Sequence, residues 1–422
     1  MLDIRFIREN PERVRHGVGL KRGNVAFVDE ALQLDEQRRE YLQQTEALKS
    51  TRNTVSGQIA AMKAKKEDAA AVIAEMKSVS DEIKVCDEKL RDVELRLHST
   101  LLQIPNLPHE SVPEGTSPEE NAVVSTWGEE EERDFTPKPH WEIAEHLGII
   151  DFARGTKITG AGFPVYVGKG ARLERALINF FLDQAAAKGY TEMMPPLVVN
   201  AESATGTGQL PDKEDQMYTV ERDMLYLVPT AEVPVTNFLR DEIVPESQLP
   251  SRFCAYTPCF RREAGSYGKD VRGLNRVHQF NKVELVKFVH PDRSYEELES
   301  LRVDAEDLLK KLGLRYHVLL MCSGDLGFTQ SKKYDLEVWA IGQKKWLEVS
   351  SVSNFETYQA RRMNIRFKPA GGGKPEILHT LNGSALALPR IVASLLERYQ
   401  TPEGKVIVPK VLHTYTGFEV IG

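Results

Sequence analysis

The chain has 422 residues, of which 41% are hydrophobic and 28% are charged, and its formal net charge is −7. This length exceeds one ordinary hydrophobic core and predicts at least two domains, while the negative charge requires any contact with nucleic acid to use a local basic surface. The sequence has no apolar run of the roughly 20 residues that cross a bilayer, no apolar leader, and no CxxC pair among its four cysteines, so we expect a cytoplasmic protein without membrane spans, disulfides or zinc.

Two heptad patterns dominate the first quarter of the chain, after a short predicted helix at residues 10–18. Mostly apolar residues alternate in steps of four and three over residues 34–62, and the same alternation runs over residues 69–97. Since only a short polar stretch joins them, they predict an antiparallel helical hairpin over about residues 29–100. With about 33 residues in each helix, this arm should reach on the order of 50 Å.

Heptads alone are typical of a dimerisation or scaffold coiled coil. Basic residues gather toward the tip of the hairpin and favour an anionic partner instead, although Glu67 and Asp68 dilute that charge. The basic residues are Lys49, Arg52, Lys63, Lys65 and Lys66. Both interpretations remain open at this point.

A proline-rich linker separates the arm from the rest of the chain. Pro105, Pro108, Pro113 and Pro118 interrupt helical periodicity, and an acidic stretch follows at residues 128–134. We place the boundary near residue 110, which divides the chain into residues 1–110 and 111–422.

The second part predicts an α+β domain on an antiparallel sheet. An amphipathic helix is expected at residues 171–188, and strands are expected at residues 224–228, 282–288 and 346–350, without regular alternation of helix and strand. Neither a GxxxxGK[ST] loop nor a strand-linked GxGxxG is present, so a bound nucleotide would need another device to hold its phosphates.

Arginines on a predicted hairpin could supply that device. The segment at 260–266 carries Arg261, Arg262 and Glu263, and the returning segment at 276–284 carries Phe280 and Glu284. An arginine fork can hold phosphate oxygens, a carboxylate can accept an amino group, and an aromatic ring can cover a base. Singly, each residue is more typical of a surface ion pair or a core aromatic, and it is their combination that indicates a site.

Acidic residues alternate with apolar ones in the segments YDLEVW, at 334–339, and EVSSVSN, at 348–354. Carboxylates on adjacent strands can hold a hard cation, and Glu348 and Ser351 are the candidate ligands. The alternative is a half-exposed strand pair with incidental acids.

Together these residues resemble the seryl-tRNA synthetases of the common bacterial type, a family of class II aminoacyl-tRNA synthetases. The resemblance covers essentially the whole chain, including the arm. Residues 189–196, 260–280 and 382–390 look like the three class motifs, which are individually loose. The segment PTAEVP at 229–234, together with YDLEVW and EVSSVSN, is more specific to the serine enzymes.

The resemblance implies roles for individual residues. Arg261 and Arg390 would be catalytic, and Glu348 with Ser351 would bind Mg²⁺. The implied serine pocket consists of Thr230, Ala231, Glu232, Glu284, Thr380 and Ser384. The implied ATP site consists of Arg261, Arg262, Glu263, Val277, Phe280, Glu348, Val349, Ser350, Ser351 and Arg390.

The resemblance also implies an activity: activation of L-serine with ATP, then transfer of serine to the 3′-terminal adenosine of tRNA(Ser), with tRNA(Sec) as a second candidate. It implies a homodimer formed through the first motif, which leaves the arm free to grip RNA. Ala385 and Pro389 depart from the usual third motif, so the exact backbone conformation of that motif is not predicted. Val352 stands where many relatives have a cysteine. Two alternatives are a ligase that loads a carrier protein, whose known forms lack the arm, and a coiled-coil protein that has lost catalysis.

Overall fold

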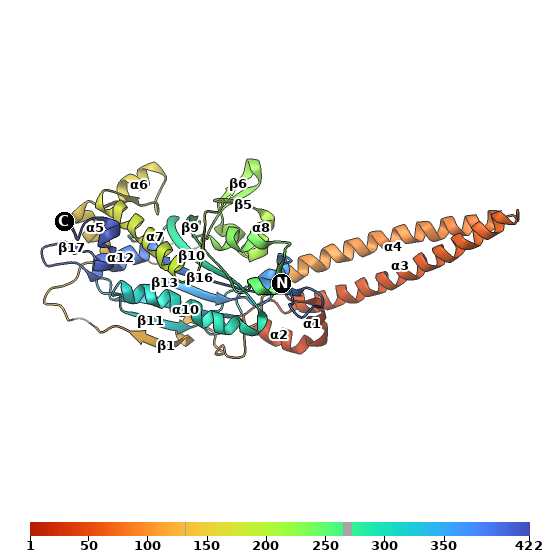
Figure 1. The fold of residues 1–422 in the computed structure, drawn as a ribbon, viewed down its shortest axis with the longest axis horizontal. Helices are drawn as coiled ribbons and strands as arrows, with labels where there is room; N and C mark the ends of the chain where they lie inside the picture. The colour runs from red at the N-terminus through yellow and green to blue at the C-terminus, as the bar shows by residue number, and fades with distance from the viewer. Residues whose placement is uncertain (131, 265–271) are drawn as a thin grey trace. The chain divides into compact units, whose positions relative to one another are not determined.

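The computed structural model describes residues 1–130, 132–264 and 272–422. Two compact units make up the chain, Met1–Pro105 and Asn106–Gly422 (Figure 1). One residue of the acidic stretch and the loop of the arginine hairpin, residues 131 and 265–271, lie outside the described residues.

The first unit is helical throughout its length. It contains α1 (Ile4–Glu9), α2 (Pro11–Leu20), α3 (Ala26–Ala64) and α4 (Ala70–Leu102). The short helix expected at 10–18 is α2, and α1 precedes it, because Pro11 favours the first turn of a helix and starts a new one there. Asp3 caps α1 by accepting a hydrogen bond from the backbone N–H of Arg5 at 2.8 Å.

The predicted hairpin is confirmed, with α3 and α4 lying side by side (Figure 1). The heptad positions are buried or half-buried, among them Leu34, Val55, Ile83 and Leu97, while most positions between them are exposed. Ion pairs join the helices at Arg38–Glu94, 3.2 Å, and Lys49–Asp87, 3.0 Å. The first helix begins earlier than the heptads predict and has 39 residues, so packing near its base extends it beyond the seam.

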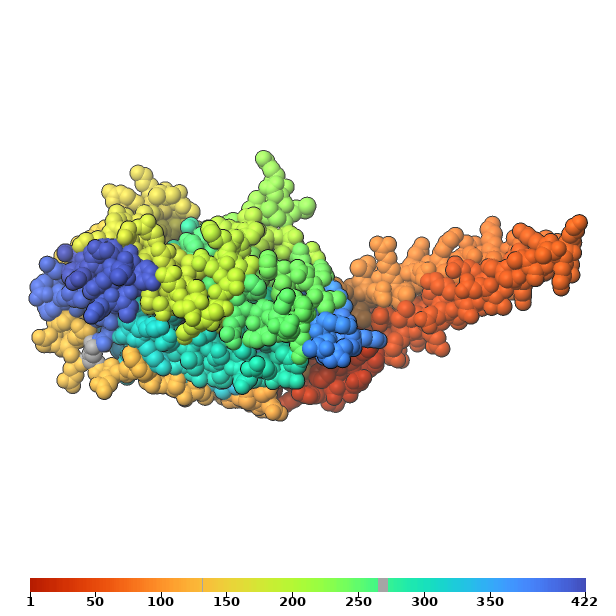
Figure 2. All heavy atoms as spheres, in the orientation of Figure 1, coloured from red at the N-terminus to blue at the C-terminus, as the bar shows by residue number. Residues whose placement is uncertain are grey.

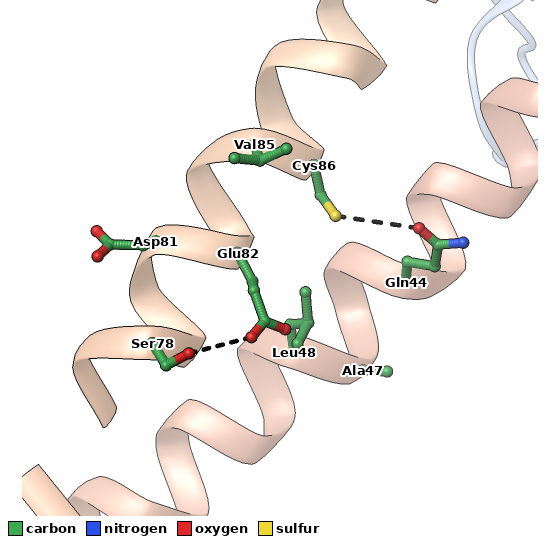
Figure 3. A pocket seen from close by; sticks show the side chains of 8 residues that line it. All are labelled: Gln44, Ala47, Leu48, Ser78, Asp81, Glu82, Val85 and Cys86. Carbon is green, nitrogen blue, oxygen red and sulfur yellow. Dashed lines mark hydrogen bonds between the residues drawn. The ribbon is translucent and has the colours of Figure 1, made fainter. Parts of the chain in front are cut away.

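A cavity of about 640 Å³ lies along the hairpin between α3 and α4. Figure 3 shows Glu82 reaching toward Leu48 and accepting a hydrogen bond from Ser78 Oγ at 3.3 Å. On the next turn, the Cys86 thiol faces Gln44 Oε1 at 4.0 Å. Polar side chains thus enter the seam here, and the two helices pack less closely than a seam of Leu and Ile would.

The second unit is built on an eight-stranded sheet, counted over the described residues. All neighbours in it are antiparallel except β4 and β9. In spatial order the strands are β1 (Ala122–Trp127), β11 (Tyr316–Leu320), β12 (Lys332–Ala340), β13 (Lys345–Asn354), β16 (His379–Ala387), β10 (Gln279–Val289), β9 (Ser251–Phe260) and β4 (Thr191–Met193). The α+β architecture is therefore confirmed, and the expected strands at 282–288 and 346–350 lie within β10 and β13.

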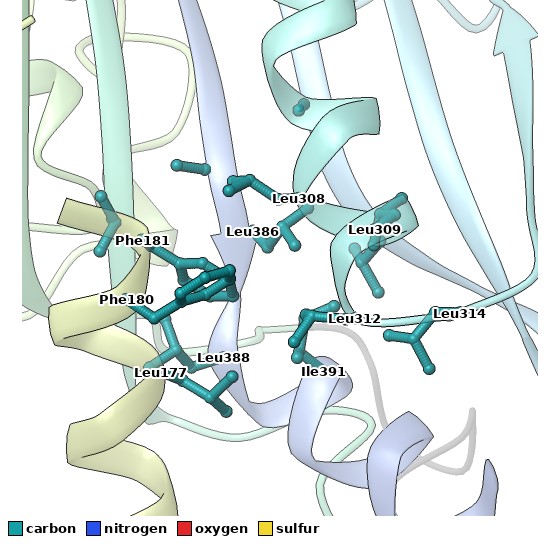
Figure 4. Close-up of a cluster of buried hydrophobic side chains, with 14 of the residues drawn as sticks. Leu177, Phe180, Phe181, Leu308, Leu309, Leu312, Leu314, Leu386, Leu388 and Ile391 are labelled. Atoms are coloured by element: carbon teal, nitrogen blue, oxygen red, sulfur yellow. The ribbon is translucent and has the colours of Figure 1, made fainter. Parts of the chain in front are cut away.

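Helices cover the sheet and form the main core with it. Figure 4 shows Phe181 of α7, Leu308 of α10, and Leu386 and Ile391 near the β16–α12 junction pointing toward one another. In the space-filling view, the yellow-green surface of α7 adjoins the teal surface of α10 (Figure 2). The helices of this unit are α5 (His140–Leu147), α6 (Phe152–Ile158), α7 (Lys169–Ala187), α8 (Ala201–Thr207), α9 (Glu232–Thr236), α10 (Ser294–Lys311), α11 (Tyr358–Arg362), α12 (Leu388–Arg398) and α13 (His413–Thr416).

Smaller sheets complete the second unit. The strand expected at 224–228 is β7, in one of these small sheets. Their strands are β2 (Ile150–Asp151) with β3 (Val165–Tyr166), β5 (Val198–Asn200) with β7 (Leu225–Leu227) and β6 (Thr219–Val220), β8 (Ile243–Pro245) with β14 (Arg366–Lys368) and β15 (Glu376–Ile377), and β17 (Val406–Ile407) with β18 (Val420–Ile421). In the part of the chain that is described, none of the helices combines the length and apolarity needed to traverse a bilayer.

Candidate active site

A pocket of about 460 Å³ opens over β12, β13, β16 and β10, which are consecutive neighbours in the sheet. The segments that line it lie far apart in the sequence and meet because the sheet order differs from chain order. Of the predicted site residues, the pocket is lined by Thr230, Glu232, Arg261, Glu263, Val277, Phe280, Glu284, Glu348, Val349, Ser350, Ser351, Ser384 and Arg390. The fold thus brings most of the predicted site into one cavity.

Arg261 directly follows β9 and is held there by backbone contacts. Its N–H donates to the carbonyl of His278 at 2.9 Å, and its side-chain Nε donates to the carbonyl of Pro229 at 3.2 Å. The guanidinium carbon lies 5.1 Å from the centre of the Phe280 ring. A cation therefore lies beside an aromatic surface on which a planar base could stack.

Glu263 lies in the left-handed backbone region, with φ of +49°. Its carboxylate accepts a hydrogen bond from Arg276 Nη1 at 2.9 Å. Backbone strain of this kind in a non-glycine residue tends to occur at functional sites. The ion pair joins the two sides of the arginine hairpin and keeps the carboxylate at the pocket.

Arg390 lies in the first turn of α12, next to Pro389, whose missing N–H removes no helical hydrogen bond at that position. Its Nε donates to the carbonyl of Asn275 at 3.1 Å, and Nη1 donates to the carbonyl of Glu348 at 2.6 Å. The same Nη1 lies 3.6 Å from Glu348 Oε2. The guanidinium therefore connects the arginine hairpin, β13 and α12 at one point of the pocket.

A β-bulge explains how Glu348 and Ser351 face the same pocket. Residues three apart on a regular strand point to opposite faces. Glu348 pairs with Glu337 of β12, but Ser350 pairs with Leu336, so β13 holds one extra residue at Val349. The extra residue returns Ser351 to the face of Glu348, and both are half-exposed in the pocket.

The charges around Glu348 keep it ionised. Burial alone would raise its pKa, but the positive charges of Arg390 and Lys333 hold that pKa below its ordinary value. On β12, the neighbouring Asp335 pairs with Ser351 in register, and burial raises the pKa of Asp335 even though Lys333 Nζ lies 3.0 Å from Oδ2. A carboxylate and a hydroxyl are the hard oxygen donors that Mg²⁺ prefers, so the chemistry of Glu348 and Ser351 fits this cation.

Glu284 lies at the floor of the pocket, 2% exposed, within a small polar group. Lys282 Nζ lies 2.5 Å from its Oε2, and the hydroxyls of Thr230 and Ser384 lie 3.5 and 3.4 Å from the same oxygen. Ala385 and Pro389 depart from the usual third motif, so the sequence did not predict the backbone here. The structure has a bulge in β16 after Ser384, where Leu386 takes a φ of +72°. This arrangement presents a buried carboxylate with hydroxyl neighbours to a small polar ligand.

Glu232, the first residue of α9, is the second carboxylate in this part of the pocket. Burial raises its pKa, and the negative charge of Glu284 raises it further. Gln359 Nε2 donates to Glu232 Oε1 at 2.7 Å, and Gln359 Oε1 accepts from Thr380 Oγ1 at 2.8 Å. Thr380, 1% exposed, is outside the lining that the described residues form and reaches the pocket through Gln359.

Two other predicted residues also stand apart from the lining formed by the described chain. Ala231 is fully buried in the cluster that includes Val235 and Ala255. Arg262 is exposed, and its backbone N–H donates to the carbonyl of Gln216 at 2.9 Å. Both flank residues that do line the pocket, and a motif match alone does not distinguish a lining residue from its chain neighbour.

Three lysines in the lining, Lys213, Lys282 and Lys333, were not predicted from the sequence. Burial lowers the pKa of Lys213, and the positive charge of Arg261 lowers it further. Lys282 and Lys333 each precede a carboxylate by two positions on a strand, a spacing that places both on one face and could have revealed them. Lys213 lies in an irregular segment and has no such pattern.

The pocket therefore combines cations suited to phosphate oxygens with buried carboxylates suited to an ammonium or a hydroxyl. Its chemistry fits a polyphosphate and a small amino acid bound side by side.

Comparison with known proteins finds matches for both units of the chain. Residues 1–108 match the seryl-tRNA synthetase N-terminal domain, and residues 218–399 match the tRNA synthetase class II core domain (G, H, P, S and T). Serine–tRNA ligases of Salinibacter ruber and Carboxydothermus hydrogenoformans are each 53% identical to this chain, with 100% of the chain and 99% of each relative covered. The crystal structure of seryl-tRNA synthetase from Pyrococcus horikoshii complexed with ATP is 37% identical with a TM-score of 0.95, covering 100% of this chain and 99% of that one.

Proposed function

The chain belongs to the seryl-tRNA synthetase family, the serine–tRNA ligases, and we propose that its pocket joins L-serine to ATP before the seryl group passes to the 3′-terminal adenosine of tRNA(Ser). The observation that carries this proposal is the meeting, in one pocket of about 460 Å³, of Arg261 and Arg390 with the half-buried carboxylate of Glu232 and the buried carboxylate of Glu284. The family membership argues against a protein that has lost catalysis. Full-length similarity that includes the hairpin argues against a ligase for carrier proteins.

In the first step, the serine carboxylate attacks the α-phosphorus of ATP, and pyrophosphate leaves. Neither this attack nor the later attack by a ribose hydroxyl on seryl-adenylate requires a nucleophile from the protein. Arg261 binds the α-phosphate, and Arg390 binds the γ-phosphate and covers one face of the adenine. Positioning and charge stabilisation supply most of the acceleration.

The remaining nucleotide contacts follow the hairpin and β13. Glu263 accepts a hydrogen bond from the adenine amino group, and Phe280 covers the face of the adenine opposite Arg390. Val277, Val349 and Ser350 line the same region, and the exposed Arg262 contacts the nucleotide from the rim. Glu348 and Ser351 would hold a Mg²⁺ ion, which would supply positive charge to neutralise the phosphates.

Selection of serine depends on the two carboxylates, Glu232 and Glu284. Glu284 accepts a hydrogen bond from the serine hydroxyl, and the hydroxyls of Thr230 and Ser384 support this carboxylate. Glu232 forms an ion pair with the serine ammonium group. Thr380 supports Glu232 through Gln359, and Ala231 shapes the wall behind them. Alanine in place of serine would leave the carboxylate of Glu284 without its hydrogen bond, which rejects alanine more strongly than shape alone.

Residues 1–110 form the tRNA-binding domain, and residues 111–422 form the catalytic domain. The hairpin of α3 and α4 supports this division, because a thin arm with paired heptads has reach but little core, and lysines lie near its tip. The RNA substrate is tRNA(Ser), and tRNA(Sec) is a second candidate. The arm grips RNA in this proposal, so dimerisation falls to another surface.

That surface includes the first class motif. Met194 is 93% exposed and Leu197 is 41% exposed, so two apolar side chains close together in the sequence lie on the surface here. We assign the homodimer contact to this region. A cytoplasmic location agrees with the cysteines, each of which is a free thiol.

Two assays test the proposal in sequence. Purified protein should catalyse serine-dependent exchange between ATP and pyrophosphate in the absence of RNA. It should then charge total tRNA with serine in preference to each other amino acid. Absence of exchange with serine would contradict the proposed reaction, and charging with another amino acid would contradict the assignment of the substrate.

A further inference from the structure

A buried network lies next to the pocket and centres on the carboxylate of Glu397, which is 0% exposed. Oε1 accepts from the backbone N–H of His140 at 3.0 Å, from His140 Nδ1 at 2.9 Å and from Gln343 Nε2 at 2.7 Å. Oε2 accepts from the backbone N–H groups of Gly342 at 2.9 Å and Gln343 at 3.2 Å. A buried carboxylate is tolerated only when its oxygens are satisfied, so Glu397 fastens α5, the β12–β13 turn and α12 together.

The hydrogen bonds of His140 determine which ring nitrogen carries the proton. The backbone N–H of Leu274 donates to Nε2 at 2.8 Å, so Nε2 is an acceptor and the proton of the neutral ring is on Nδ1, facing Glu397. The chain reaches this position at Gly273, whose φ is +68°. An added Cβ there would lie 2.2 Å from His140 Nε2, so the close approach requires glycine.

The network ends at the arginine that the proposed mechanism uses. Asn275 Nδ2 donates to Gln343 Oε1 at 2.7 Å, and the carbonyl of Asn275 accepts from Arg390 Nε at 3.1 Å. Leu274 and Asn275 line the pocket. Thus Glu397 holds His140 and Gln343, these hold residues 274 and 275, and residue 275 orients Arg390.

We propose that His140, together with Glu397, is a positioning residue for ATP binding, because it fixes the return of the arginine hairpin against which Arg390 is oriented. It touches no ligand and transfers no proton in this role. The proposal rests on the proposed function of the pocket only in that the pocket binds ATP. It does not depend on which amino acid is activated.

A second histidine–carboxylate pair, in which the histidine is buried and the carboxylate is half-buried, provides the control. His317 Nε2 lies 2.6 Å from Glu337 Oε2, between β11 and β12, and His317 is 9% exposed. Neither residue is in the pocket lining of the described chain. A purely structural role for buried histidine would therefore give the same phenotype at both positions.

The test compares His140→Asn, His140→Gln and His317→Asn. Asparagine keeps a donor near the Nδ1 position and removes the acceptor for Leu274, whereas glutamine places an acceptor near the Nε2 position. Thermal unfolding, the KM values for ATP and serine in exchange, and calorimetric ATP binding without amino acid are measured for each variant. His140→Asn should raise the KM and Kd for ATP about tenfold with an unchanged KM for serine.

His140→Gln should restore much of the ATP affinity, and His317→Asn should lower Tm without changing ATP affinity. In a double-mutant cycle with Arg390→Ala, the effect of His140→Asn on kcat/KM for ATP should shrink, since His140 acts through Arg390. Equal effects of His140→Asn and His317→Asn on ATP affinity, or full additivity with Arg390→Ala, would overturn the proposal. Wild-type protein that binds ATP but shows no exchange with serine would contradict the proposed function alone.

Discussion

Lys282 and Glu284 lie two residues apart on β10, and their charged groups meet at 2.5 Å where both side chains are less than a tenth exposed. The lysine gives the carboxylate an ionic partner at the floor of the pocket, where serine is proposed to bind. The pair also means that removing either charge leaves the other buried without its partner. Substitutions here therefore affect both binding and stability, and the two effects have to be separated.

Glu284→Gln should raise the KM for serine at least about tenfold and leave the KM for ATP nearly unchanged, because it weakens a hydrogen bond to a charged acceptor. Glu284→Ala should have the same effect on serine. Both variants should also destabilise the protein, since each leaves Lys282 buried without a charged partner, and Glu284→Ala, which removes the hydrogen-bond acceptor as well, should cost about 3–5 kcal/mol. Exchange kinetics and denaturant unfolding measure the two effects. Serine kinetics like those of wild type in both variants would refute the role of this carboxylate.

Glu232→Gln should stabilise the protein at pH values above the raised pKa of Glu232 while weakening serine activation. The pKa of Glu232 is raised in the folded state, mainly by burial and then by the charge of Glu284, so the folded protein holds this proton more tightly than the unfolded chain. The wild-type protein therefore loses stability as the pH rises from the ordinary carboxyl pKa through the raised pKa of Glu232. The glutamine variant has no such proton to release and keeps its stability over this range. The Tm advantage of the variant should shrink as pH falls toward the ordinary carboxyl range.

In wild type, the same titration predicts that the KM for serine rises as pH falls through the raised pKa, because a protonated Glu232 no longer attracts an ammonium group. A KM for serine in Glu232→Gln that keeps the pH dependence of wild type would contradict this assignment.

Shortening the arm should separate the two half-reactions. Deleting residues 43–89 and closing the gap with a short glycine linker retains the base of the hairpin, including Arg38–Glu94 and the buried Leu34 and Leu97. Exchange should remain within about twofold of wild type, and tRNA charging should fall by at least about a hundredfold, since the proposed RNA contacts of the arm are lost. Undiminished charging would show that the arm does not recognise RNA.

Arg390→Lys should lower kcat/KM for ATP about a hundredfold, even though the charge is kept. A lysine ammonium cannot reproduce the fork that reaches the carbonyls of Asn275 and Glu348 together. Arg398→Lys on the same helix is the control, because Arg398 Nε donates to the carbonyl of Gly313 instead. Equal losses in both variants would indicate a general effect on α12.

Sedimentation velocity at micromolar concentration should show a homodimer, and Met194→Glu should shift it toward monomer by introducing a charge on an apolar surface. Glu substitution of the exposed Val303, on α10, serves as the control. A dimer unaffected by Met194→Glu would place the contact elsewhere.

The hairpin was predictable because its pattern is local: Leu34 to Leu97 interact through heptads that can be read along the chain. Arg261, Glu284 and Arg390 were singled out from the sequence, and the fold brings all three into one pocket. The network at His140 was not, because a single histidine before an ordinary amphipathic segment is typical of a core residue. Its partners Gln343 and Glu397 become neighbours only through the sheet order and the approach of α12.

Thr380 shows that a residue can be assigned to a site by resemblance and still lie outside the pocket lining that the described residues form. The family resemblance implies that it is part of the serine pocket, but its hydroxyl donates to Gln359, which in turn donates to Glu232. Sequence similarity records that a residue matters and does not record how many hydrogen bonds separate it from the ligand.

Because β13 holds an extra residue at Val349, a substitution and a deletion in this segment should have different effects on the pocket. A change of side chain at this position alters the packing and leaves the phase of the strand intact. Removal of one residue between Glu348 and Ser351 would rotate one of them out of the pocket while preserving every candidate ligand in the composition. Length in this segment is therefore under a stricter constraint than identity, and alignments that open a one-residue gap here would pair residues from opposite faces of the sheet.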